Sequence, residues 1–176
     1  LIKFRAKDTE GAIEDAEMAI SLKPHLTQMW QLSSSLHYEA NNLSEAVEAL
    51  RNAHKYEPEN TAFMTQLGEL LRQDNKAREA INILEQATGL APKDVAAWTN
   101  LGVALQQEKR MADAKIAYEK ALALNPKSAA IVNNLGAMAK EAKEWESALR
   151  YFGKALEIKP DFAEAHYNLG NTINEL

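Results

Sequence analysis

The chain has 176 residues, with 20 lysines and arginines against 25 aspartates and glutamates, which gives a formal charge of −5 at pH 7. This acidic balance opposes a nucleic-acid backbone as the main partner. The absence of cysteine excludes a structural disulfide, a thiol nucleophile and a thiolate metal site. No apolar run approaches the ~18 residues of a membrane span, so no spanning segment is predicted, and a cytoplasmic location is the default expectation.

Five prolines, the only ones in the chain, recur every 34 residues, which indicates that one structural element was copied. They are Pro24, Pro58, Pro92, Pro126 and Pro160. Leu-Gly pairs and single alanines recur at the same interval, at Leu67-Gly68, Leu101-Gly102, Leu135-Gly136 and Leu169-Gly170 and at Ala46, Ala80, Ala114 and Ala148. We therefore number positions within a repeat, and position 1 falls at residues 27, 61, 95, 129 and 163.

Each repeat predicts two helices, and its proline marks the end of the second because proline can neither donate an amide hydrogen bond nor continue a helix. In chain order, the position of each residue within the 34-residue repeat predicts helices over residues 10–22, 28–40, 44–56, 62–73, 78–90, 96–108, 112–124, 130–142, 146–158 and 164–175. Short polar turns are predicted inside the repeats at Asn41-Asn42, Asp74-Asn75 and Lys109-Arg110. No segment has the pattern of a strand or a flexible linker, which favours a single all-α domain over residues 1–176.

The repeat pattern also predicts how the helices pack. At about 100° per residue, positions 4, 7, 8 and 11 share one side of the first helix, and positions 20, 24 and 27 share one side of the second. Each of these two sets of positions forms a packing stripe along its helix. Glycine and alanine in the packing stripes let the helix backbones approach closely, while larger residues fill the space beside them. One helix hairpin cannot cover both stripes, so successive hairpins are expected to stack into an α-solenoid.

These recurring residues resemble the tetratricopeptide repeat (TPR). That repeat is a helix-turn-helix with Leu-Gly at positions 7 and 8, small residues at 20 and 27, a large residue at 24 and proline at 32. The copy over residues 95–128 fits it best, through Trp98, Leu101, Gly102, Ala114, Tyr118, Ala121 and Pro126. The resemblance implies a right-handed solenoid with an incomplete repeat at 1–26, full repeats at 27–60, 61–94, 95–128 and 129–162, and the first helix of another at 163–176. These incomplete ends favour a piece of a longer protein.

The sequence offers little for catalysis, and we predict no enzyme, cofactor or metal site. The four histidines, His25, His37, His54 and His166, fall at four different repeat positions, so no two share the spacing of a zinc site. The position-8 glycines lie inside helices and lack the lysine and hydroxyl residue of a phosphate loop. The three tryptophans, Trp30, Trp98 and Trp145, are interpreted as core residues.

The side of the first helices opposite the packing stripe carries the candidate binding residues. Position 6 holds Asn100, Asn134 and Asn168 in the last three repeats, whereas earlier repeats have Leu32 and Gln66. A carboxamide can donate to a peptide C=O and accept from a peptide N–H at the same time. We therefore predict a concave groove for an extended peptide, formed by the three asparagines together with Gln66, Thr99, Asn133, Tyr167 and Asn171.

The Asn-Leu-Gly strings at Asn100, Asn134 and Asn168 are similar to repeats of the O-linked N-acetylglucosamine transferase family. In that family the position-6 asparagines line the lumen of the superhelix and hold peptide backbones, and the resemblance implies this role here. Another TPR mode, the clamp for a terminal carboxylate, needs lysines at positions 5 and 2. Those lysines are missing from this chain, so the clamp is not expected.

Three functions remain open from the sequence. The first is a non-enzymatic scaffold that binds a protein or peptide partner in the groove. The second is the substrate-recruiting arm of a larger enzyme such as a glycosyltransferase. The third is self-association through the last helix, in which Leu169, Ile173 and Leu176 are expected to be exposed.

Overall fold

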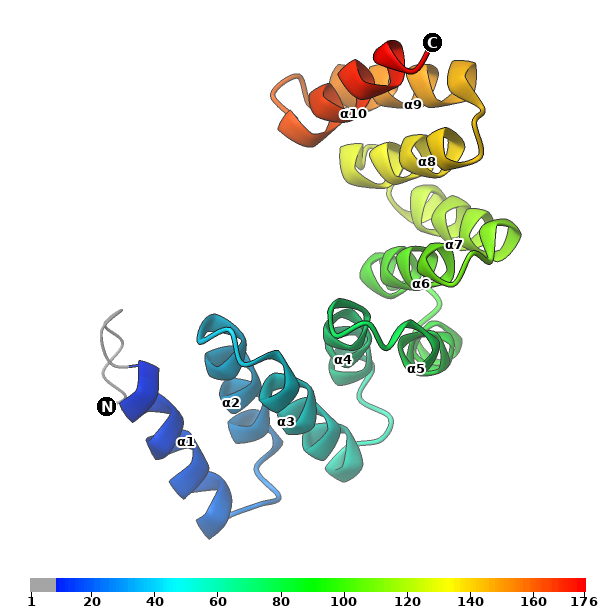
Figure 1. Cartoon of the computed structure of the whole chain (residues 1–176). Helices are drawn as coiled ribbons and strands as arrows, with labels where there is room; N and C mark the ends of the chain where they lie inside the picture. The colour runs from blue at the N-terminus through cyan, green and yellow to red at the C-terminus, as the bar shows by residue number, and fades with distance from the viewer. Residues whose placement is uncertain (1–8) are drawn as a thin grey trace. The chain divides into compact units, whose positions relative to one another are not determined.

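The computed structural model describes residues 9–176, which contain ten helices and no strand (Figure 1). Residues 1–8 of the predicted incomplete repeat lie outside the described residues. The helices are α1 (Thr9–Leu22), α2 (Thr27–Glu39), α3 (Leu43–Tyr56), α4 (Thr61–Gln73), α5 (Ala77–Leu90), α6 (Val95–Gln107), α7 (Met111–Leu124), α8 (Ala129–Glu141), α9 (Trp145–Ile158) and α10 (Ala163–Asn174). Every predicted helix is confirmed, with each end within about one residue of its predicted place.

The chain divides into two compact units, an N-terminal unit of residues 1–92 and a C-terminal unit of residues 93–176. In the N-terminal unit, each helix from α1 to α5 packs on the next one along the chain. In the C-terminal unit, α6 to α10 also pack in chain order (Figure 1). There α8 additionally contacts both α6 and α10, so the first helices of three successive repeats are neighbours.

The turns inside the repeats share one backbone conformation. Asn41, Asn75, Lys109 and Lys143 all have a positive φ, between 57° and 62°. In each case the next residue donates its amide to a carbonyl five residues back, as from Asn42 N to His37 O at 2.8 Å. This is the Schellman arrangement, in which a left-handed residue satisfies the last carbonyls of a helix. The predicted turns are confirmed, and two of the four use a lysine where glycine or asparagine is more favourable.

The close approach of the two helices in a repeat depends on the glycine at position 8. A Cβ atom placed on Gly102 would lie 2.6 Å from the Tyr118 ring, and one on Gly136 would lie 2.6 Å from the Phe152 ring. A Cβ atom placed on Gly68 would lie 2.5 Å from Leu84 Cγ. In these three repeats, therefore, the large residue at position 24 lies directly against the glycine. This contact confirms the predicted phase of the packing stripe.

Two predictions about large side chains need correction. The three tryptophans are half-buried and not core residues, and the Lys120 ammonium lies 5.5 Å from the centre of the Trp98 ring. Leu169 was expected to be exposed, but it is half-buried and packs on the cluster that contains Ala139 and Phe152. Ile173 and Leu176 are exposed, as predicted.

Candidate functional site

The predicted asparagine ladder lies within the C-terminal unit. Asn100, Asn134 and Asn168 belong to α6, α8 and α10, and all three side chains are half-buried. Since α8 packs against both α6 and α10, the three carboxamides occupy equivalent positions on adjacent helices. We call this surface the inner face of the C-terminal unit.

One member of the ladder is held by a neighbouring repeat. Asn168 Nδ2 donates to Asn133 Oδ1 at 3.1 Å, and Asn133 Nδ2 donates to Glu164 Oε1 at 3.0 Å. Only 1% of Asn133 is exposed, and both ends of its carboxamide are engaged. The expectation that Asn133 contacts a peptide is therefore wrong, because its side chain is buried between α8 and α10. Its role in the structure is to orient Asn168.

The N-terminal unit contains the same type of bond. Gln31 Nε2 donates to Gln66 Oε1 at 3.0 Å, which joins α2 to α4. In both units the bond connects position 5 of one repeat with position 6 of the next, 35 residues later. Sequence reasoning missed this pairing, although amide side chains separated by one repeat plus one residue could have indicated it. Gln66 is exposed and lies in the N-terminal unit.

The remaining ladder members keep their hydrogen-bonding capacity. Neither the Asn100 nor the Asn134 side chain makes a hydrogen bond with any residue that the structure describes. Asn168 uses one of its two amide hydrogens, which leaves the other hydrogen and Oδ1. The three residues together therefore present donors and acceptors side by side on one half-buried face.

The side chains around the ladder differ in what they can offer. The Thr99 hydroxyl donates to the Val95 carbonyl at 2.7 Å, so its oxygen remains only as an acceptor. Tyr167 is 69% exposed, and Asn171 is half-buried on α10. These three residues can contribute polar contacts and an aromatic surface to a bound chain.

A polar network joins α6 to α8 near their carboxyl ends. Gln106 Nε2 donates to Glu141 Oε2 at 2.9 Å and accepts at Oε1 from the Tyr118 hydroxyl at 3.1 Å. The Lys109 ammonium also pairs with Glu141. The hydrogen bond from Lys109, followed by that from Gln106, lowers the pKa of Glu141 below its ordinary value. The Gln106 carboxamide is therefore engaged in holding two helices together.

In residues 9–176, no group of three or more histidine, cysteine, aspartate or glutamate side chains is placed to hold a metal ion. None of the described helices is both long enough and apolar enough to cross a membrane.

Family models of the tetratricopeptide repeat match three segments, residues 37–101, 95–128 and 138–173. Together these segments cover more than half of the chain. The chain belongs to the tetratricopeptide-repeat family. No curated protein matches it in sequence.

Solved TPR structures have the same fold at low sequence identity. YrrB, described as a TPR protein with an unusual peptide-binding site, aligns with a TM-score of 0.78 at 21% identity, over 96% of this chain and 84% of YrrB. MamA aligns with a TM-score of 0.79 at 21% identity, over 89% of this chain and 92% of MamA. A MamA fragment from Desulfovibrio magneticus RS-1 aligns with a TM-score of 0.80 at 19% identity, over 89% of each chain. This likeness confirms the all-α TPR solenoid class that the sequence predicted.

Proposed function

We propose that this TPR protein is an interaction scaffold, and that the inner face of its C-terminal unit binds an extended peptide through Asn100, Asn134 and Asn168. The observation that carries the proposal is the position of three carboxamides on adjacent helices with donors and acceptors still available. The description of YrrB as a TPR protein with a peptide-binding site supports the same general function.

The spacing of the helices suits an extended chain. Packed helices lie about 10 Å apart, and an extended peptide rises about 3.3 Å per residue. A peptide that crosses α6, α8 and α10 therefore meets one carboxamide at about every third residue. Each asparagine can then pair with a peptide N–H and C=O, so the face recognises main chain more than side-chain identity.

The buried bond to Asn133 adds preorganisation at one end of the face. Asn168 is already fixed in one orientation by its 3.1 Å bond to Asn133 Oδ1. A side chain that is ordered before binding loses less conformational entropy when the peptide arrives. Asn168 is therefore expected to contribute more to affinity than Asn100, which has no such partner among the described side chains.

The test begins with a peptide selected on the full chain from a displayed random 12-residue library. Replacing Asn100, Asn134 and Asn168 together with alanine should weaken its binding at least about tenfold, since several hydrogen bonds are lost. Asn82→Ala removes an exposed asparagine from α5 and is the matched control. Both variants should keep the thermal midpoint of the wild type within a few degrees.

A second comparison separates main-chain recognition from other modes. N-methylation of alternate peptide amides should weaken binding strongly, because it removes the donors that the asparagine oxygens accept. Alanine replacement of most peptide side chains should matter less. Unchanged affinity of the triple variant, or of the methylated peptide, would reject the proposal.

Self-association is the second candidate, and one observation favours it. Ile173 is 56% exposed at the end of α10, and no atom lies within 4 Å of a Cβ placed on Gly170. In the repeats at 61–94, 95–128 and 129–162, the glycine at this position is covered by a large side chain of the next helix. If a second copy covers this surface, Ile173→Ser should shift the sedimentation profile toward the monomer. A monomeric wild type at high concentration excludes this candidate.

An enzyme-recruiting role is supported only by the resemblance of the Asn-Leu-Gly strings to O-linked N-acetylglucosamine transferase repeats. It would use the same inner face to hold a substrate peptide. Sequencing the flanking coding region tests it, because the role requires a catalytic domain in the same protein.

A further inference from the structure

The repeat at residues 27–60 departs from the pattern at two interior positions. Position 7 is Ser33 and position 11 is His37, whereas the next two repeats have leucine at both positions. Those leucines are almost completely buried in α4 and α6, at Leu67, Leu71, Leu101 and Leu105. The helix α2 therefore lacks two large apolar side chains that fill the interior elsewhere.

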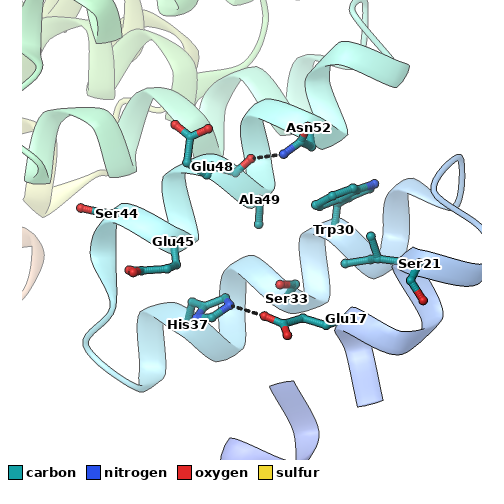
Figure 2. Close-up of a pocket in the computed structure, with 11 residues that line it drawn as sticks. Glu17, Ser21, Trp30, Ser33, His37, Ser44, Glu45, Glu48, Ala49 and Asn52 are labelled. Atoms are coloured by element: carbon teal, nitrogen blue, oxygen red, sulfur yellow. Dashed lines mark hydrogen bonds and ion pairs between the residues drawn. The ribbon is translucent and has the colours of Figure 1, made fainter. Parts of the chain in front are cut away.

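A cavity of about 410 Å³ lies where that packing is reduced, between α1, α2 and α3. Figure 2 shows Trp30 and Ser21 at one end and His37 and Glu45 at the other. Glu17 from α1 lies between the two ends, next to Ser33. All of its lining residues belong to the N-terminal unit, so the cavity is separate from the inner face of the C-terminal unit.

Two polar groups at the cavity make no hydrogen bond with any residue in the range 9–176. Ser33 is only 3% exposed and lines the cavity, yet its hydroxyl makes no hydrogen bond with any described residue. His37 Nδ1 is buried and has no hydrogen-bond partner among residues 9–176. The other ring nitrogen, Nε2, lies 3.7 Å from Glu17 Oε1. Buried polar atoms normally find partners, so the unpartnered His37 Nδ1 favours a polar occupant, and the Ser33 hydroxyl beside the cavity can bond to one.

The charge of the lining selects a cation. Glu17, Glu45 and Glu48 all line the cavity. Among the described residues, only Glu48 of these three is paired with an arginine, with 3.1 Å between Arg51 Nε and Glu48 Oε1. The carboxylates of Glu17 and Glu45 would repel a phosphate or a carboxylate. A metal ion is not favoured, because no group of three ligating side chains occurs in residues 9–176.

Trp30 favours a flat cation over a compact one. Its Nε1 donates to the Pro24 carbonyl at 2.8 Å, which fixes the indole ring at one end of the cavity. A guanidinium can stack on an aromatic face while its edge donates to carboxylates, whereas an ammonium is a strongly hydrated point charge. A guanidinium also carries only donors, which suits a lining of carboxylate and hydroxyl oxygens.

We propose that the cavity between α1, α2 and α3 binds an arginine side chain of a partner protein. The guanidinium stacks on Trp30 and donates to Glu17, Glu45 and the Ser33 hydroxyl. This repeat lacks leucines at positions 7 and 11, and the space that they would fill becomes a site for a charged side chain. This contact is independent of the main-chain recognition proposed for the C-terminal unit.

The test uses the full chain and the peptide acetyl-Gly-Arg-Gly-amide, followed by NMR through the indole N–H of Trp30. Trp30→Phe assigns that resonance among the three tryptophans. The arginine peptide should shift it in a saturable manner, and the neutral citrulline peptide should bind at least about tenfold more weakly. Raising the salt concentration should weaken binding of the arginine peptide, since salt screens the charges of exposed carboxylates.

Ser33→Leu is the decisive variant because it restores the leucine of the other repeats and fills the cavity. It should abolish the shift while leaving thermal stability equal to the wild type or higher. Glu45→Gln changes only an exposed side chain, so it keeps the fold and should weaken binding several-fold. Equal binding of the arginine and citrulline peptides, or an unchanged affinity in either variant, would overturn the proposal.

The alanine variant of Asn100, Asn134 and Asn168 is the control for independence. It should leave the Trp30 response unchanged, because those residues lie in the other unit. If this variant no longer binds the selected 12-residue peptide but still shows the Trp30 shift with the arginine peptide, the two sites act independently. Failure of the arginine test therefore does not count against the inner face, and the converse also holds.

Discussion

Replacing Gly102 with alanine tests the helix contact on which the whole repeat depends. The new methyl carbon would lie 2.6 Å from Tyr118 Cε1 and 2.7 Å from Cδ1. Ordinary carbon contacts lie near 3.5–4.0 Å, so the ring or the helix must move by about 1 Å. Tyr118 is only 1% exposed, and its hydroxyl is bonded to Gln106, which restricts such movement.

Two opposing effects set the size of the change. Overpacking a buried site costs about 1–3 kcal/mol, and the restricted ring places this case near the upper end. Alanine favours the helix over glycine by about 1 kcal/mol. The net expectation for Gly102→Ala is a loss of about 2 kcal/mol in the free energy of unfolding.

Urea unfolding followed by circular dichroism measures this loss. Gly153→Ala is the matched control, because Gly153 lies within α9 and a Cβ there meets no atom within 4 Å. The control should gain up to about 1 kcal/mol from helix propensity alone. If Gly102→Ala proves as stable as Gly153→Ala, the assigned contact between positions 8 and 24 is wrong.

Two further predictions concern the turns and the polar network. Lys143→Gly should raise the free energy of unfolding by about 0.5–1 kcal/mol, because Lys143 has a φ of 60° that glycine adopts freely; a lower urea midpoint would contradict this. Glu141 should titrate below the ordinary glutamate value in a carboxyl NMR titration, and Lys109→Met should raise its pKa. Because the folded pKa is the lower one, the stabilisation by Glu141 is present above the unfolded pKa and is lost as the pH falls through the folded pKa. An unchanged Glu141 titration in the variant would show that Lys109 is not the main cause.

Much of the fold could be predicted from the sequence because the repeat places equivalent residues in equivalent surroundings. The spacing of the prolines located the second helices, and the glycine and alanine ladders identified the faces that pack. These are local properties. Proline cannot continue a helix beyond its first turn, and helix periodicity places the glycine and the alanine positions on one face.

The candidate site was less predictable, since periodicity gives the side of a helix but not the depth of a side chain. Asn133 was expected at the groove and is buried, because α10 covers it and Glu164 accepts its hydrogen bond. Trp98 was expected in the core and is only half-buried. Both outcomes depend on how neighbouring helices meet.

The sequence by itself determined the repeat length, the helices and the faces that pack, because these follow from patterns within about 34 residues. Only the tertiary structure decided which polar side chains pair across repeats and which keep their donors and acceptors. It also brought Glu17, Ser33 and Glu45 to one cavity from three helices. The physical reason is that burial and pairing depend on the distance between elements, which a single helix cannot specify.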